Sequence, residues 1–529
     1  MTFASLLALS LGLTACSGGQ APTAAEQPLI STNGSEPQKG LLPTNTSEVG
    51  GGKVLSQIFA GLVTFDATGK MELDQAASIE PSKENKVWTI KLRPGLTFST
   101  GEAVTVQSFI DAWQYGALLS NAQSAAGFFD NFEGFSATKD SKLTGLKKVS
   151  DLEFVVTLKN PEVDFPLRLG YSAFMPMPAD AYKDMRAFGE SPVGNGPYKF
   201  ETADAWKHQE GIRLVKNDAY QGPQEAKNAG LEIKFYAQPD SAYQDSLGGH
   251  LDVLDRVPSS AFGSFEGDFE GRVVNQPASI FHSLTIPQYL EHFKPGKEGE
   301  LRRAAVSMAI DRASVVDKIF SNTATPAKDF SSPVINGFNA DLKGNEVLAY
   351  NPTKAADLWK QADAISKYEG TFTIGYNADG DHRAWVDAVA GMIGQNLGIT
   401  AEGKSYPTFK QLLDDEDTAA VGGGFRSGWQ GDYPAQVNFL SQQYRSTGGS
   451  NKGRYDNPDF DAALDQAAAA SSQEGARKGY SAAQEILMKD LPSIPLWNVN
   501  AVGTLSDRVD NVKFAWNSVP LYYSITLKN

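Results

Sequence analysis

Two apolar periodicities alternate through most of this chain, and they limit its possible folds more than any other feature. Residues 86–92 and 152–158 place apolar side chains at every second position, which is typical of strands with one buried face. Between them, an apolar stripe from Val106 to Trp113 recurs at helical spacing after Thr105, a residue suited to an N-cap. A helix enclosed by two strands predicts an α/β fold.

The second half of the chain continues this alternation. Helical periodicity predicts helices over residues 301–309 and 386–397, and strict alternation predicts a strand over 372–376. The residues that mark where helices begin or end are Asp311, Asn351 before Pro352, Asn457 before Pro458, and Gly398. The α/β interpretation therefore extends over the whole folded part of the chain.

Length and charge narrow the class of protein. A chain of 529 residues is too long for one ordinary hydrophobic core, so two or more lobes are expected. Apolar residues make up 41% and charged residues 21%, the balance of a soluble globular protein. The net charge of −15 repels nucleic acid, which is therefore not an expected partner. The single cysteine, Cys16, leaves no internal disulfide and no thiolate metal cluster.

The N-terminal residues have the pattern of a lipoprotein signal. Residues 3–15 form an apolar run shorter than the roughly 20 residues that a membrane-spanning helix needs. We therefore interpret residues 1–15 as a signal peptide, and its end, Leu-Thr-Ala before Cys16, resembles the bacterial lipobox, in which the cysteine receives a lipid. Residues 16–28 are small and polar and predict a flexible tether. An extracytoplasmic, membrane-anchored protein is expected; the alternative is a buried cysteine in a small N-terminal helix.

Common catalytic and metal-binding patterns are missing from the sequence. No GxxxxGK[ST] or GxSxG motif occurs, and the five histidines lack partners at metal-ligand spacing, so we expect no metal and no cofactor. We interpret each histidine as a surface or packing residue. The acidic run from Asp414 to Asp417 is interpreted as a solvated helix end. With 62 acidic residues, the sequence leaves room for a catalytic pair of carboxylates, so a secreted hydrolase is a competing hypothesis.

Four blocks of sequence carry a resemblance to a known family. They are NKVWTIKLRPGLTFSTGEAVTVQSFIDAW at 85–113, GNGPYKF at 194–200, LRRAAVSMAIDRASVV at 301–316 and SGWQGDYPAQVNFL at 427–440. In this order and at these distances they resemble the oligopeptide/dipeptide-binding family of solute-binding proteins that serve ABC importers. The likeness covers roughly residues 30–529.

This resemblance implies a type II periplasmic-binding-protein fold. Two α/β lobes would be joined by two crossing strands, with an extra domain on the first lobe. By order of blocks, lobe I is expected at 29–65, 190–279 and 499–529, the extra domain at 66–189, and lobe II at 280–498. The crossing strands are expected near 277–281 and 495–499.

The stretch 426–440 holds the ligand site that the resemblance implies. Asp432 matches the family's acid for the ammonium group of a peptide, whose burial costs several kcal/mol unless a counter-charge meets it. Trp429 would provide a flat apolar wall, and Tyr433 follows the acid directly. In the alternative interpretation, Asp432 caps a turn and Trp429 belongs to the core.

The remainder of a peptide would be held as an added strand through main-chain hydrogen bonds. The partners that the alignment implies are Ser427, Gly428 and Trp429 in lobe II, and Glu48, Val49 and Gly50 in lobe I. Arg426 matches a position whose arginine meets the C-terminal carboxylate of a peptide in some members; alternatively it is a salt-bridged lobe residue.

The resemblance therefore predicts a monomeric solute-binding lipoprotein, without enzymatic activity, that captures short peptides between its lobes and delivers them to the permease of an ABC transporter. Anchoring at the membrane would come from lipid on Cys16. A second hypothesis keeps this fold and changes the solute to a nickel chelate, haem or a sugar.

Overall fold

The computed structural model describes residues 28–82 and 84–528, which form an α/β structure, as the alternating periodicities predict. Its largest sheet has 12 strands. In sheet order, ten of them are β16 (Thr400–Tyr406), β15 (Thr371–Asn377), β17 (Gly424–Gln430), β13 (Val273–Thr285), β18 (Ser493–Leu505), β12 (Val253–Leu254), β1 (Ile30–Gly34), β11 (Gly230–Phe235), β10 (Gly211–Lys216) and β8 (Tyr198–Phe200). The other two are β14 (Ala324–Pro326), which pairs with β18, and β9 (Trp206–Lys207), which pairs with β10.

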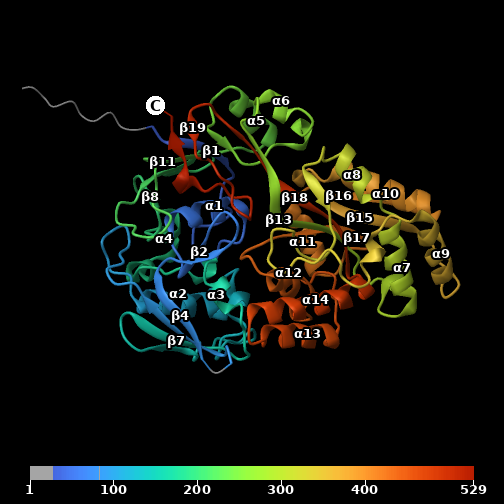
Figure 1. The fold of residues 1–529 in the computed structure, drawn as a ribbon, viewed down its shortest axis with the longest axis horizontal. Helices are drawn as coiled ribbons and strands as arrows, with labels where there is room; N and C mark the ends of the chain where they lie inside the picture. The colour runs from blue at the N-terminus through green and yellow to red at the C-terminus, as the bar shows by residue number, and fades with distance from the viewer. Residues whose placement is uncertain (1–27, 83, 529) are drawn as a thin grey trace, which may run out of the picture.

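Two long strands, β13 and β18, connect the two halves of the molecule (Figure 1). They run antiparallel, with Val273 opposite Thr504 at one end and Thr285 opposite Ser493 at the other. The register shifts between Pro277 and Phe281, next to a proline that has no N–H for the ladder, and again between His282 and Ser283. Both ranges in which crossing strands were expected lie inside these two strands.

Smaller sheets complete the strand inventory. A four-stranded antiparallel sheet has the order β4 (Ala76–Ser82), β5 (Val87–Leu92), β7 (Glu153–Thr157) and β6 (Leu146–Lys148). Two hairpin-like pairs are β2 (Val63–Phe65) with β3 (Met71–Leu73), and β19 (Val509–Asp510) with β20 (Thr526–Leu527).

The helices flank these sheets, and the predicted marker residues Asp311, Asn351, Asn457 and Gly398 stand at helix ends. The helices predicted over 301–309 and 386–397 begin four and three residues before these ranges, at Lys297 and Arg383. The first six are α1 (Val49–Ile58), α2 (Val106–Ala117), α3 (Phe165–Arg168), α4 (Met185–Glu190), α5 (Pro239–Leu247) and α6 (Phe265–Asp268). The others are α7 (Lys297–Met308), α8 (Arg312–Lys318), α9 (Pro352–Asp363), α10 (Arg383–Leu397), α11 (Phe409–Asp417), α12 (Gln436–Tyr444), α13 (Pro458–Ala468) and α14 (Gln473–Asp490). Side chains of the N-cap residues Asp311, Asn351 and Asn457 accept backbone N–H groups, and Gly398 ends α10 at a φ of 71°.

Separate hydrophobic clusters stabilise the two halves, and two of them lie in the half that contains β1. One cluster, built only from residues between Leu62 and Ala181, surrounds the four-stranded sheet and α2. A second joins β1, β10 and β11 to Phe514 and Tyr522 from the C-terminal segment. The C-terminal residues therefore return to the half of the molecule in which β1 lies, as the predicted lobes require. The residue bounds given for the lobes stay a prediction.

One surface assignment was wrong. Glu416, inside the acidic run, is only 4% exposed because it lies on the inner face of α11. Burial raises the pKa of its carboxyl to about 7. The run is therefore not simply a solvated helix end.

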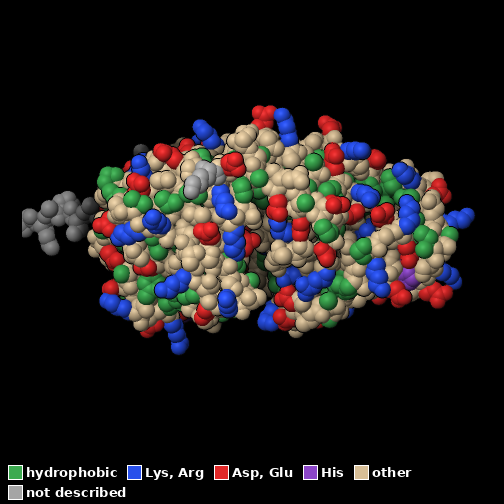
Figure 2. Space-filling view, turned by 90° about the horizontal axis from the view of Figure 1, so that it is seen from below, with side chains coloured by type: hydrophobic (Ala, Val, Ile, Leu, Met, Phe, Trp, Pro, Cys, Tyr) green, Lys and Arg blue, Asp and Glu red, His purple; other side chains and the backbone are tan. Residues whose placement is uncertain are grey.

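The two halves touch each other beyond the crossing strands. The backbone N–H of Val163 donates to the carbonyl of Ala468 at 2.9 Å, and the Asn85 side chain donates to the carbonyl of Ala470 at 3.1 Å. Figure 2 shows that the halves meet along a groove on the lower face. Within residues 28–82 and 84–528, no helix has the length and apolar character needed to cross a membrane. The predicted signal peptide, Cys16 and nearly all of the predicted tether lie outside the described residues.

Candidate functional site

Strand β17 offers main-chain groups on one side only. It pairs with β13 along its length, from Ile280 opposite Gln430 to Thr285 opposite Phe425. On its other side, β15 pairs with β17 only at Gly424 and Phe425. In the described part of the chain, no strand therefore covers residues 426–430 on that side. These residues form a free sheet edge, with which a ligand in extended conformation could pair as an added strand.

The chain turns sharply at the end of β17, and Gly431 permits this turn. Its N–H donates to the carbonyl of Ser279 on β13 at 2.9 Å. A Cβ at this position would collide with the Ser279 hydroxyl and the ring of Trp516. Glycine is therefore needed for the close approach that directs the next residue, Asp432, away from the strand.

The carboxylate of Asp432 is held by an asparagine on α12. Asn438 Nδ2 donates to Asp432 Oδ2 at 2.8 Å, and Asn438 Oδ1 accepts from the Asp432 backbone N–H at 2.9 Å. The same oxygen accepts from Trp429 Nε1 at 3.0 Å. Asn438 thus fixes both the predicted acid and the predicted aromatic wall. Sequence reasoning missed it, because the contact depends on a turn and on a helix, α12, that the sequence analysis did not predict.

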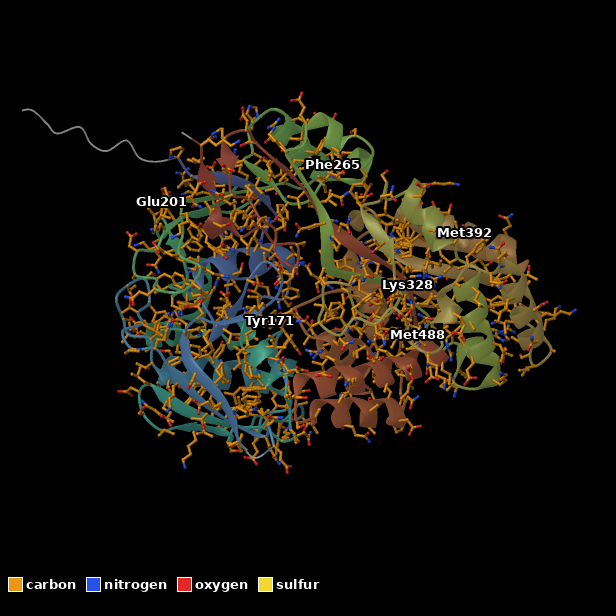
Figure 3. All side chains as sticks on the ribbon, in the orientation of Figure 1. Tyr171, Glu201, Phe265, Lys328, Met392 and Met488 are labelled. Carbon is orange, nitrogen blue, oxygen red and sulfur yellow. The ribbon has the colours of Figure 1, made fainter. Side chains whose placement is uncertain are left out.

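A tyrosine from the opposite half reaches the same acid. Tyr171, which Figure 3 labels in the left half close to the junction, interacts electrostatically with the Asp432 carboxyl. Burial raises the pKa of that carboxyl to about 6, against the opposing effect of its hydrogen bond to Asn438 and its interaction with Tyr171. Asp432 therefore lies at the boundary between the halves, in a setting where an additional positive partner would be favourable.

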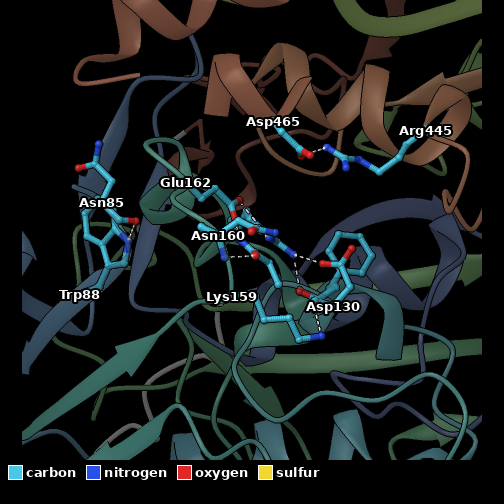
Figure 4. Close-up of polar contacts among 11 residues, drawn as sticks. Asn85, Trp88, Asp130, Lys159, Asn160, Glu162, Arg445 and Asp465 are labelled. Atoms are coloured by element: carbon cyan, nitrogen blue, oxygen red, sulfur yellow. Dashed lines mark hydrogen bonds and ion pairs between the residues drawn. The ribbon is translucent and has the colours of Figure 1, made fainter. Parts of the chain in front are cut away.

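Tyr433 is placed differently from the other predicted site residues. Its side chain is 6% exposed, and electrostatic interaction links it to Arg168 and Glu162 of the opposite half. Arg168 Nη1 in turn donates to both Glu162 oxygens at 2.9 Å. Figure 4 shows Glu162 and Asp130 in this cluster, with the Arg445–Asp465 pair on the other side of the junction. Tyr433 is thus part of the contact between the halves, and a ligand contact for it stays a prediction.

The three predicted contacts in lobe I do not form an extended strand, contrary to what the resemblance implied. Glu48 alone has an extended backbone, and it is the N-cap of α1: its carboxylate accepts the Gly51 N–H at 2.9 and 3.0 Å. Val49 and Gly50 belong to the first turn of that helix. The physical reason is that an acid in the N-cap position satisfies N–H groups that would otherwise lack partners. Val49 is 65% exposed, so contact with a ligand through its side chain stays a prediction.

Arg426 stands near two histidines that sequence reasoning treated as ordinary. Its Nε donates to Asn377 Oδ1 at 2.7 Å, and its guanidinium lies over the Phe409 ring at 4.2 Å. Burial, with the added effect of the charges of Arg426 and Arg256, lowers the pKa of His282 to about 3 and that of His382 to about 2. The histidine rings are 6.1 Å apart. These two neutral histidines and two cations make a positive region that an anionic group would stabilise.

Comparison with known proteins agrees with this architecture. With the structure of the Escherichia coli murein tripeptide binding protein MppA the TM-score is 0.80 at 22% identity, over 96% of this chain and 99% of that one. With the unliganded open form of MppA it is 0.74. With Haemophilus influenzae OppA in complex with RPPGFSPFR it is 0.78 at 23% identity, over 96% and 100% of the two chains. Two α/β lobes, two crossing strands and an extra domain thus define a type II periplasmic-binding-protein fold.

The family follows from the sequence comparisons. The model described as "Bacterial extracellular solute-binding proteins, family 5 Middle" matches residues 70–451. The chain is 25% identical over 464 residues to the oligopeptide-binding protein OppA of Bacillus subtilis, with 84% of this chain and 83% of that protein covered. The chain therefore belongs to the family 5 extracellular solute-binding proteins, whose members are binding proteins rather than enzymes, and the resemblance stated above is confirmed.

Proposed function

We propose that this protein captures short peptides between its two lobes and delivers them to the permease of an ABC importer. The observation that carries the proposal is the uncovered edge of β17, with Asp432 directly beyond its end. A peptide is the common solute that combines main-chain groups for such an edge with an ammonium group for such an acid. Relatives that carry peptide-binding names support this choice.

Asp432 neutralises the ammonium group of the bound peptide. Its carboxylate already accepts from Asn438, and the hydrogen bond to an ammonium group adds a charge-assisted interaction. Because the site is partly buried, this interaction is worth about 1.5–3 kcal/mol, more than an exposed ion pair would give. Residues Ser427, Gly428 and Trp429 bind the first peptide units through the free edge.

The carboxylate end of the peptide meets Arg426. The orientation of the Arg426 side chain is fixed by Asn377 and by the Phe409 ring, so this side chain loses little freedom on binding. His282 and His382 remain neutral beside it and can donate hydrogen bonds. Contacts from both lobes then favour the closed form by their differential free energy, and the closed form is what the permease recognises.

Cys16 and the residues that follow it anchor the protein at the outer surface of a membrane through lipid. Replacing Cys16 by alanine in the full-length chain is expected to move the protein from the membrane fraction to the soluble fraction. Persistence of the variant in washed membranes would contradict the lipid anchor and leave the peptide site unaffected.

Native mass spectrometry of freshly purified protein tests the solute directly. We expect adducts whose masses fit short peptides, and a melting temperature that rises when a matching peptide is added. The peptide should be recovered intact after incubation, because no step of this function breaks a bond. A haem, nickel chelate or sugar adduct, or consumption of the peptide, would overturn the proposal.

A further inference from the structure

A separate cavity of about 240 Å³ lies across the junction of the two halves. One wall comes from the β2–β3 turn and the start of α3, including Lys70 and Asp164. The other comes from residues 434–436, Asn336 and the first two turns of α14. None of residues 426–432 lines it, so it is distinct from the edge of β17. A water occupies about 30 Å³ of liquid, so the cavity has room for a small organic molecule.

Two cations on the cavity wall lack partners in the described part of the chain. Arg477, on α14, makes no hydrogen bond or ion pair there, and the ammonium group of Lys70 makes none either. The neighbouring Glu474 is already paired with Lys478 at 2.8 Å. Arg477 and Asp164 influence each other electrostatically but form no direct ion pair. A small anion could therefore be held without displacing an existing contact.

Two oxygen acceptors complete the wall. Asp164 is 5% exposed, and in the described residues its carboxylate accepts no side-chain hydrogen bond; the Tyr480 hydroxyl is likewise buried without a hydrogen-bond partner. Gln436 is 1% exposed; its Nε2 donates to the carbonyl of Gly337 at 2.7 Å, which leaves Oε1 buried without a partner. A buried acceptor without a donor is costly, so these two groups favour a ligand that donates.

We propose that this cavity binds a small α-amino acid as its zwitterion, with the carboxylate held by Arg477 and Lys70 and the ammonium group by Asp164 and Gln436. In such a zwitterion the ammonium and carboxylate groups are attached to the same carbon atom, which matches a cation and an acid that lie near each other without forming an ion pair. Because the cavity exists only where the halves meet, an occupant favours the closed form. This site goes beyond the proposed peptide site and does not depend on it.

Isothermal titration calorimetry of the ligand-free protein at neutral pH tests the site with L-alanine as the probe. We expect saturable binding of L-alanine, and binding of acetate or methylammonium that is weaker by about tenfold or more, because each keeps only one of the two charged contacts. Absence of saturable L-alanine binding would overturn the proposal even if peptides bind. If acetate bound as tightly as L-alanine, recognition of a zwitterion would be refuted.

Variants locate the bound probe. Arg477→Gln and Asp164→Asn should each weaken L-alanine binding by about tenfold or more. Lys478→Gln, on the same helix but paired with Glu474, should leave it unchanged, and so should Asp432→Asn in the peptide site. Loss of binding in Asp432→Asn with retention in Arg477→Gln would place the probe in the peptide site and refute this one. Arg477 is only partly buried, so its variant carries the test if Asp164→Asn fails to fold.

Discussion

At the scale of single residues, the proposed site contains charged groups that are poorly solvated before a ligand arrives. The pKa of the Asp432 carboxyl is raised to about 6, so this group is mostly ionised at neutral pH although burial disfavours its charge. The folded pKa lies above the ordinary value of 3.8, so the unfolded chain loses this proton first as the pH rises. The free energy of unfolding therefore falls between pH 3.8 and about 6. An arriving ammonium group removes that disadvantage.

Replacing Asp432 by asparagine should therefore separate binding from stability. We expect peptides with a free N-terminus to bind about 2 kcal/mol more weakly, measured by calorimetry at pH 7.5. The ligand-free variant should melt at the same temperature or higher, because it buries no charge. An N-acetylated peptide is the matched control, and it should bind the wild type and the variant with nearly equal affinity. An unchanged affinity for the free peptide would remove the assigned role.

The histidine pair predicts a loss of stability in acid. The pKa values of His282 and His382 are depressed to about 3 and about 2, below the ordinary 6.5, so the unfolded chain takes up protons first as the pH falls below 6.5. His382→Gln should flatten the decline in unfolding free energy between pH 7 and pH 5 by about 2 kcal/mol, measured with urea. His250→Gln, at an exposed position, should follow the wild type. A variant as acid-sensitive as the wild type would refute the contribution of His382.

At the scale of elements, β17 is the decisive strand because it is covered along one side only. Its partner β13 anchors it, and β15 diverges after Phe425. Helix α1 has a contrasting role: its N-cap Glu48 organises the first turn and leaves no extended edge in Val49 and Gly50. Main-chain recognition is therefore expected from lobe II rather than equally from both lobes.

The free edge predicts that backbone donors of the ligand matter more than its side chains. A tripeptide with one N-methylated amide in the paired region should bind about 0.5–1.5 kcal/mol more weakly than its unmodified counterpart, the usual net value of a hydrogen bond. Methylation of each amide in turn, followed by calorimetry, identifies the paired positions. If every methylated peptide bound as well as the parent, strand addition on β17 would be excluded.

At the scale of the whole molecule, the two halves are joined by two crossing strands and by contacts that can separate. The Val163–Ala468 and Asn85–Ala470 hydrogen bonds link segments far apart in the sequence. The crossing strands are long and continuous, so opening requires little more than loss of the junction contacts and adjustment near Pro277.

Closure should be visible in solution scattering. Adding peptide is expected to reduce the radius of gyration, and Asn85→Ala should weaken peptide binding by about 1 kcal/mol because it removes one contact made only when the halves meet. Gln107→Ala, which removes an exposed bond to Asp111 within one half, should change neither quantity. An Asn85→Ala protein with wild-type affinity would show that this contact does not contribute to closure.

The amino-acid sequence determined the local elements and the family. The side chains of Asp311, Asn351 and Asn457 accept N–H groups within three residues, so their caps could be predicted without knowledge of the fold. The blocks around residues 85–113 and 427–440 identified the family for the same reason: they are contiguous in the chain.

The tertiary structure alone decided which distant groups share an environment. Asn438 meets Asp432, Tyr171 reaches it from the other half, and Arg256 and Arg426 act on two histidines 100 residues apart in the sequence. The burial of Glu416 was likewise decided by the tertiary structure. Desolvation and charge interaction depend on distance in space, and periodicity in a sequence specifies only which face of an element is apolar.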